Sequence, residues 1–278
     1  MSGAASPRES LLEILRVERV RDAEFIARLE DFWGASLGGD ALARAALAAA
    51  DGCEGLELQS SHACFLRPLP AEIPLRLRVE RLTEGSDPVT RQVRIEGDGL
   101  LCQVVASFAR PGAGPAFQDV TLAAALPAPE ELPGTLEQAQ AEGWSDYARG
   151  PIEFRRAHPR VWPDPSGETS GGHIEWVRPR APLPEDPRLH MAALVFLADF
   201  YSHWPFERRI GRSFAYGPFR TLDHALWVHR NVRWSDWWLL ETSSELGHAG
   251  RALSRRRIFT RDGVLVASAA QAALVATA

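Results

Sequence analysis

The 278-residue sequence has only three cysteines, Cys53, Cys64 and Cys102, and none belongs to a CxxC pair. Because this number is odd and the cysteines are scattered, they predict neither a disulfide framework nor a zinc site, and we expect reduced structural thiols. No apolar run approaches the length of a membrane-spanning helix. Arg8 and Glu9 interrupt the N-terminal region, so no secretory signal peptide is expected. These absences together favour a cytoplasmic location.

Positive charge is also in short supply, with 31 Lys and Arg against 36 Asp and Glu and a net charge of -5. A nucleic-acid partner is not expected, because binding to phosphates needs a basic surface. The sequence lacks GxSxG, the nucleophile elbow of serine hydrolases, and HExxH, a zinc motif. Its single histidines, such as His190 and His229, are not spaced as metal ligands. We therefore predict neither a metal nor a cofactor.

The sequence does contain an order of elements that occurs twice. In the first half, an alanine-rich helix over 41–50 precedes strands expected at 58–66, 75–82, 89–95 and 100–108. In the second half, a helix over 189–200 precedes strands expected at 221–229, 237–243, 251–260 and 264–273. Val105-Ala106-Ser107 in the first half matches Val266-Ala267-Ser268 in the second. This repetition indicates two similar modules.

A stretch rich in Pro and Ala separates the halves and shows no sustained period before about Trp144. We predict an N-terminal module at 1–112, a linker at 113–149 and a C-terminal module at 150–278. A second cluster of Pro and Gly, over 159–172, predicts a long loop. A long helix against a curved antiparallel sheet is the hotdog arrangement. The predicted fold class is therefore α+β, a double hotdog of two tandem modules.

Particular motifs then suggest a family. They are Gly38-Gly39 before the alanine-rich helix, SHACFLRP at 61–68, LPEDPRLH at 183–190, TLDHALW at 221–227 and DGVLVAS at 262–268. In these motifs the sequence resembles the acyl-CoA thioesterase II family, which comprises TesB-like double hotdog enzymes, over most of the chain outside the linker. The resemblance implies hydrolysis of a fatty or related acyl-CoA thioester to free acid and coenzyme A. It further implies attack by an activated water and no acyl-enzyme.

The resemblance also implies a water-activating cluster of one Asp, one Thr and one Gln in the second module. Asp223 lies at the aspartate position and Gln271 at the glutamine position. Glu245 lies where the family has threonine, and the nearby hydroxyl of Ser244 is our preferred substitute. The place that corresponds to Asp223 in the first half is Ser60, so we expect one active centre per chain.

Candidate substrate contacts come from two features. The N-terminal end of a hotdog helix offers free backbone N–H groups that can stabilise an oxyanion, which makes Gly38 and Gly39 candidates. Guanidinium groups suit the phosphates of coenzyme A, and Arg251 begins a strand with three further arginines. His62, within the SHACFLRP motif, completes the set.

Two other functions stay open. A hotdog protein can bind an acyl-CoA or a carrier-tethered acyl chain without hydrolysing it, and the departure at Glu245 favours this reading. A hydratase or dehydratase usually needs a His and a carboxylate together. His224 adjoins Asp223, but neighbouring residues on a strand point to opposite faces. Because hotdog sheets commonly pair by their edges or faces, assembly into a homo-oligomer is open as well.

Overall fold

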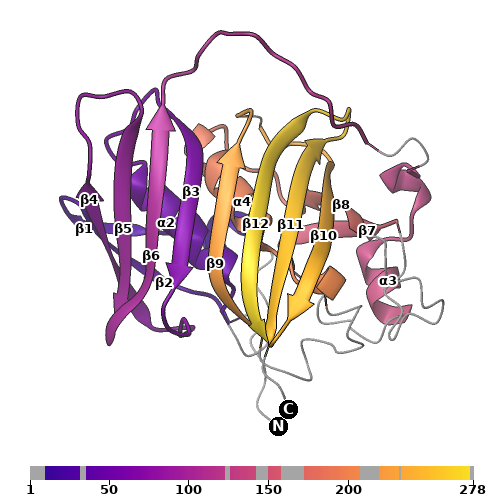
Figure 1. Ribbon diagram of the computed structural model, residues 1–278, viewed down its shortest axis with the longest axis horizontal. Coiled ribbons are helices and arrows are strands. Elements are labelled where there is room, and N and C mark those ends of the chain that lie inside the picture. The colour runs from indigo at the N-terminus through magenta and orange to yellow at the C-terminus, as the bar shows by residue number, and fades with distance from the viewer. Residues whose placement is uncertain are drawn as a thin grey trace.

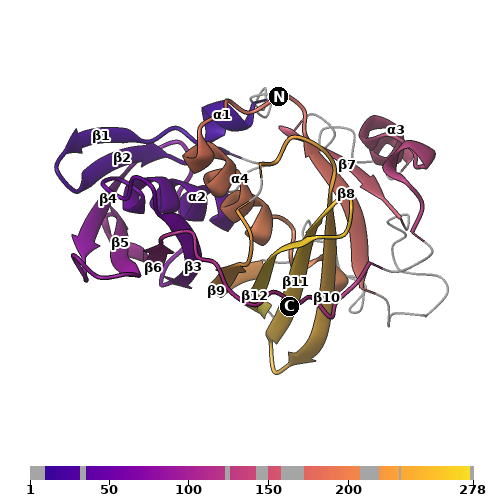
Figure 2. The ribbon, with the colours of Figure 1, turned by 90° about the horizontal axis from the view of Figure 1, so that it is seen from above.

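The computed structural model describes residues 10–31, 36–122, 126–141, 150–157, 172–206, 219–231 and 233–275. Within these ranges, twelve strands form one antiparallel sheet that curves around two helices, α2 (Gly38–Ala49) and α4 (Pro187–Asp199) (Figures 1 and 2). The loop predicted at 159–172 lies, except for Gly172, outside the described residues. None of the described helices has the length and hydrophobicity that a membrane crossing requires.

The elements of the first half, in chain order, are α1 (Leu11–Ile14), β1 (Glu18–Arg21), β2 (Glu24–Arg28), α2, β3 (Glu57–Phe65), β4 (Pro74–Arg81), β5 (Val89–Gly97) and β6 (Gly99–Ala109). The second half contains β7 (Ile152–Arg156), β8 (His173–Pro179), α4, β9 (Phe219–Val228), β10 (Trp238–His248), β11 (Arg251–Thr260) and β12 (Leu265–Val275). Both long helices and the eight strands predicted from alternation are present. Strands β1, β2, β7 and β8 were not predicted.

The strand order is β1-β2-β4-β5-β6-β3-β9-β12-β11-β10-β8-β7, so β3 and β9 pair where the two halves meet. Ser60 lies opposite Trp227 and Cys64 lies opposite Asp223 in this antiparallel pair. One continuous sheet therefore serves both modules, with α2 and α4 on its concave side (Figure 2). The predicted α+β double hotdog is confirmed.

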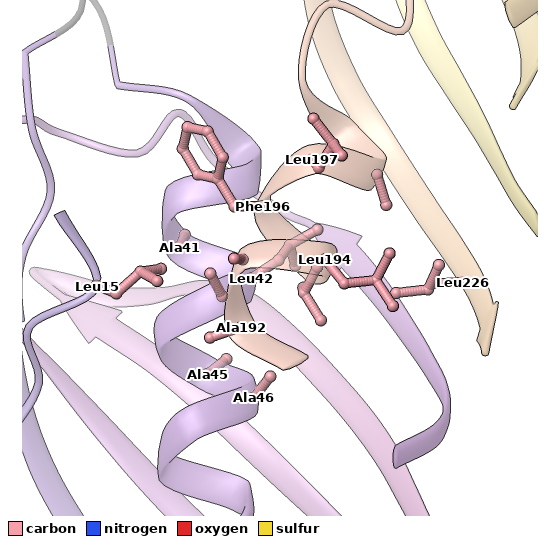
Figure 3. Packing of buried hydrophobic residues seen from close by; sticks show 14 of the residues in the cluster. Leu15, Ala41, Leu42, Ala45, Ala46, Ala192, Leu194, Phe196, Leu197 and Leu226 are labelled. Atoms are coloured by element: carbon pink, nitrogen blue, oxygen red, sulfur yellow. The ribbon is translucent and has the colours of Figure 1, made fainter. Parts of the chain in front are cut away.

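The two helices pack directly on each other through small residues, including Ala41, Ala45 and Ala192 (Figure 3). A Cβ atom added at Gly39 would lie 2.6 Å from the carbonyl oxygen of Phe196, which is closer than real Cβ atoms approach. Gly39 is therefore required for the contact between α2 and α4. This contact brings the first turn of α2 against the last turn of α4.

Hydrogen bonds at the strand ends show which residues of the two halves correspond. The N–H groups of Leu66 and Arg67 donate to Leu101 O, as those of His229 and Arg230 donate to Val266 O. Val266 therefore corresponds to Leu101, and the predicted match of Val266 with Val105 is wrong by four residues. Side chains of a strand alternate between its two faces, so shifting an alignment by an even number of residues keeps the inward and outward positions matched. A sequence comparison therefore cannot detect a shift of four residues from this pattern.

The predicted linker carries structure of its own, with a 3₁₀ turn at Pro129–Glu131 and helix α3 (Thr135–Ala141). The Thr135 hydroxyl donates to Phe154 O at 2.7 Å and accepts from Phe154 N at 2.8 Å. Leu122 and Leu132 pack against a small cluster around Trp237 on the second module. The chain from β6 thus crosses to the second module and is fixed there (Figure 1). The boundaries at 112 and 149 stay a prediction.

Candidate active site

A cavity of about 520 Å³ opens where the N-terminal turn of α2 meets the C-terminal end of α4. The ends of β3 and β12 and the start of β9 complete its wall. Its polar lining includes Asp199, Thr221 and Gln271, and its apolar lining includes Phe65 and Phe219. Residues from both halves are needed to form it, because α2 and β3 come from the first module.

Asp199 is the last residue of α4 and is only 7% exposed. Its Oδ2 accepts a hydrogen bond from the backbone N–H of Gly39 at 2.6 Å, so the carboxylate joins the two helices. Its Oδ1 is buried and has no hydrogen-bond partner within the described chain. A buried carboxylate oxygen without a donor is rare, and here it leaves one acceptor free beside the cavity.

Gln271 on β12 is held from both sides. Its Oε1 accepts from the Ser202 hydroxyl at 2.5 Å, and its Nε2 donates to Thr221 Oγ1 at 2.8 Å. A register shift between Ala272 and Ala273 in the pairing of β12 with β9 brings Thr221 to the side on which Gln271 lies. Because Gln271 occupies one lone pair of the Thr221 oxygen, the hydroxyl proton of Thr221 stays available to another acceptor.

His224 lies opposite Gln271 in the sheet and is buried. Burial lowers the pKa of His224, and the nearby Asp199 carboxylate and a hydrogen bond to the Ala198 carbonyl offset only part of that effect. The ring is therefore neutral at neutral pH. The cavity lining includes Asp199 and Gln271 but not His224.

Asp223 does not join this cluster. It is exposed, lies opposite Ala272, and accepts a hydrogen bond from Ala272 N at 3.3 Å. Gln271 is 5% exposed and lies opposite His224, so Asp223 and Gln271 leave the sheet on opposite faces. The prediction that both side chains hold one water is not supported by this geometry.

Ser244 and Glu245 also lie apart from the cavity. β10 continues through both residues to His248, with a register shift between Ser244 and Leu246. The Ser244 hydroxyl is buried and donates to Leu253 O at 2.9 Å. Glu245 is exposed and forms an ion pair with Arg255 at 3.6 Å.

The candidate substrate contacts divide in the same way. Gly38 lines the cavity, and Gly39 lies next to it with its N–H on Asp199. His62 is exposed on the sheet, where its ring meets Trp227 edge-on at 5.5 Å. Arg251 is exposed at the start of β11. Neither His62 nor Arg251 lies in the described lining.

Sequence reasoning did not single out Asp199 and Thr221, which line the cavity with Gln271. The structure assembles one Asp, one Thr and one Gln, the set that the resemblance implied, but only Gln271 is the residue expected. Thr221 stands two residues before Asp223 in the same motif. Asp199 was detectable as a lone acid at the end of a helix whose preceding residues, Val195 to Ala198, are all apolar.

Comparisons with known proteins place the chain in a family. Residues 118–275 match the family model of the acyl-CoA thioesterase C-terminal domain, and residues 33–110 match that of the N-terminal domain. The chain belongs to the acyl-CoA thioesterase family. Acyl-CoA thioesterase 2 of Haemophilus influenzae is 26% identical to this thioesterase over 285 residues, covering 96% of each chain.

Solved structures agree with this assignment. The acyl-CoA thioesterase II TesB2 of Mycobacterium marinum has a TM-score of 0.79 and 29% identity, and the match covers 97% of this thioesterase and 99% of that chain. A hot dog fold protein from Alicyclobacillus acidocaldarius has a TM-score of 0.81 at 14% identity, covering 96% and 98%. At this lower identity the likeness shows the fold alone.

Proposed function

We propose that this thioesterase hydrolyses its acyl-CoA thioester in the cavity between α2 and α4, with Asp199 as the general base. The observation that carries the proposal is the buried, unpartnered Oδ1 of Asp199 in a cavity that also contains Thr221 and Gln271. An ionised carboxylate within reach of a water accepts its proton as the water attacks.

Thr221 and Gln271 orient that water. The hydroxyl of Thr221 and the amide of Gln271 already form one hydrogen-bonded unit that ends at Ser202. A water donating one proton to Asp199 Oδ1 can accept a hydrogen bond from the Thr221 hydroxyl. Its second lone pair then points at the thioester carbon. Positioning of this kind lowers the activation free energy, because the entropy of bringing the reactants together is lost on binding and not in the chemical step.

The carbonyl oxygen of the thioester becomes negatively charged as the water adds. The first N–H groups of α2 have no acceptor inside the helix, and the helix dipole favours negative charge at that end. Gly39 N–H is committed to Asp199, so Gly38 is the residue placed to stabilise the oxyanion. Collapse of the intermediate breaks the C–S bond, and the proton held by Asp199 passes to the leaving thiolate.

The cysteines are poor candidates for a covalent step. Burial raises the pKa of the Cys102 thiol to about 12, and burial also raises the pKa of Cys53. A thiol is nucleophilic only as the thiolate, so neither is activated at neutral pH. Cys64 is exposed and paired in register with Asp223, away from Gln271.

Coenzyme A would extend from the cavity across Arg67 and Arg220, which both contribute to the lining. Guanidinium groups bind phosphate oxygens well, and these two replace Arg251 as the candidate phosphate contacts. Coenzyme A is accordingly the second product. The nature of the acyl chain, a cytoplasmic location and a homo-oligomeric state stay predictions.

The two alternative functions lose their main support. Glu245, which favoured binding without turnover, lies outside the cavity, so its departure from the family pattern leaves the site unaltered. The pair of His224 and Asp223, which suggested hydration chemistry, lies outside the cavity lining, in which the histidine is His203.

The test compares two acids in one assay. Release of free thiol from acyl-CoAs of graded chain length is measured for the parent, Asp199→Asn and Asp223→Asn. We expect Asp199→Asn to lower kcat by roughly two to four orders of magnitude, the scale of a lost general base. Asp223→Asn should match the parent. The reverse pattern would return the base to Asp223, and a parent that binds acyl-CoA without releasing thiol would refute hydrolysis itself.

A further inference from the structure

The end of α4 that carries Asp199 lacks the usual means of ending a helix. The last four carbonyl groups of a helix have no partner inside it, and a glycine in the left-handed region commonly closes the turn. Here Phe200 follows Asp199, and Tyr201 adopts the left-handed conformation with φ +51°. A side chain in that region is strained, so this turn needs support from outside the helix.

The support comes from a buried arginine of β11. Arg256 Nη1 donates to Leu197 O at 2.7 Å and to Phe200 O, the carbonyls on either side of Asp199. The side chain is 2% exposed, and its Nε donates to the Thr242 hydroxyl of β10 at 2.9 Å. The guanidinium is thus fixed to the sheet at one end and to the helix terminus at the other.

Charge reinforces this geometry. The C-terminal end of a helix carries partial negative charge, which a cation there stabilises, more strongly when the contact is buried. The first half shows that the fold does not require an arginine at this place. Arg256 lies opposite Ala269 in the second half, and Val93 lies opposite Val104 in the first. Because Ala269 corresponds to Val104, Arg256 corresponds to Val93. The half without a catalytic acid therefore has a valine where the half with one has Arg256.

We propose that Arg256 is a positioning residue that holds the C-terminal turn of α4 so that the Asp199 carboxylate faces the attacking water. This inference rests on the proposed function of Asp199. Arg256 does not line the cavity beside Gln271 and does not touch the substrate. It acts through the peptide groups of Leu197 and Phe200, while Thr242 fixes its orientation.

The test uses Arg256→Lys, which keeps the charge but cannot span Thr242 and two carbonyls together, and Thr242→Val as a milder change. The matched control is Arg91→Lys. Arg91 is also buried in a strand and donates to two carbonyls, Thr83 O and Thr90 O, but it lies in the first half. The thiol-release assay gives kcat and KM. Hydrogen exchange is measured at the Gly39 amide, which donates a hydrogen bond to Asp199 Oδ2.

We expect Arg256→Lys to lower kcat about a hundredfold with KM little changed, the size of effect that a displacement near 1 Å produces. Hydrogen exchange at the Gly39 amide should accelerate in the same variant. Thr242→Val should also lower kcat and accelerate Gly39 exchange, each by a smaller factor than Arg256→Lys. Arg91→Lys should leave both at the parent values even where it lowers the melting temperature equally.

An unchanged kcat or an unchanged Gly39 amide in Arg256→Lys overturns the inference, as does an equal response in Arg91→Lys. If Asp199→Asn abolishes activity while Arg256→Lys retains it, the inference fails and the proposed function stands. If the parent releases no thiol from any acyl-CoA, the proposed function fails, and the Gly39 exchange alone decides whether Arg256 positions Asp199.

Discussion

The cavity that we propose as the active cavity has a counterpart at the opposite end of the helix pair, where α4 begins and α2 ends. This second cavity has a volume of about 500 Å³, against about 520 Å³ for the first. The two cavities occupy equivalent places in the duplicated fold, with the roles of the two halves reversed. By the register fixed at Leu66 and Leu101, Thr221 corresponds to Leu58, and Ala273 corresponds to Phe108. All four residues line their respective cavities.

The chemistry lies in what the second cavity lacks. Leu58 replaces the Thr221 hydroxyl, and Ala106 stands at the position that corresponds to Gln271. The chain leaving α2 contributes Ala50 and Cys53 to the wall, where the end of α4 contributes Asp199. Glu57 stands at the position of the second cavity that corresponds to Arg220, so the charge that would meet a coenzyme A phosphate is reversed there. The duplicated fold builds these two related cavities, and under the proposed function a few side chains decide which one hydrolyses the thioester.

The helix ends differ as well. α2 begins at Gly38 and Gly39, which leave room for other groups at its N-terminus. α4 begins at Pro187, which has no N–H, and the Asp186 carboxylate already accepts a hydrogen bond from Arg188 N at 2.9 Å. Hydrogen bonding to Arg188 lowers the pKa of Asp186, so the cap is negatively charged at neutral pH. An oxyanion would be repelled there.

The largest effect in this comparison should come from copying one cavity into the other. Thr221→Leu gives the active cavity the residue of its counterpart and removes the group that orients the water, so we expect kcat to fall about a hundredfold. Leu58→Thr places a hydroxyl among apolar groups and should cost roughly 1–3 kcal/mol of unfolding free energy without changing kcat. Steady-state kinetics and urea unfolding measure both, and equal losses of kcat in the two variants would contradict the asymmetry.

The sequence predicts strands with a clear apolar face better than strands without one. Strands with apolar alternation were found, and β11 was predicted at both ends, as Arg251–Thr260. β1 was missed because all four of its residues are exposed and give no apolar face. β8 was missed because its buried face contains His173 and Glu175, which hide the hydrophobic period.

The candidate site residues likewise include some that a local sequence pattern indicates and others that it does not. Gln271 follows the DGVLVAS motif and was proposed from it, whereas Asp199 lines the same cavity only because the end of a helix packs over a distant strand. Thr221 depends on a one-residue register shift between β9 and β12, and no alternation pattern indicates such a shift. Contacts of this kind belong to the tertiary structure, so a pattern within one segment cannot reveal them.

A smaller effect should follow acidification, because the halves differ in buried histidines. The second half contains His224, whose pKa burial lowers from the usual 6.5, whereas His62 of the first half is exposed. With the folded pKa below the unfolded one, the unfolded chain binds the proton more readily. Stability is then unaffected well above pH 6.5 and falls as the pH drops below it, by up to about 1.4 kcal/mol per pH unit for one such histidine.

The measurement is urea unfolding between pH 7 and about pH 5, a range in which histidines titrate. His224→Gln should reduce the slope of unfolding free energy against pH, and the matched variant His62→Gln should leave the slope of the parent. If the two variants give the same slope, the acid sensitivity does not arise from the buried ring beside Asp199.

The smallest effect is expected on the convex face, at the position that the sequence comparison had aligned with the family threonine. Glu245 is 52% exposed in its side chain and meets Arg255, itself 61% exposed, at 3.6 Å. Ion pairs so open to solvent contribute about 0–1 kcal/mol, and a side chain on this face cannot reach a water held by Gln271. Glu245→Ala and Glu245→Thr should therefore both keep the kcat and the pH profile of the parent. A loss of activity in Glu245→Ala with recovery in Glu245→Thr would mean that β10 contributes a hydroxyl to catalysis, and Thr221 would no longer be the threonine of the site.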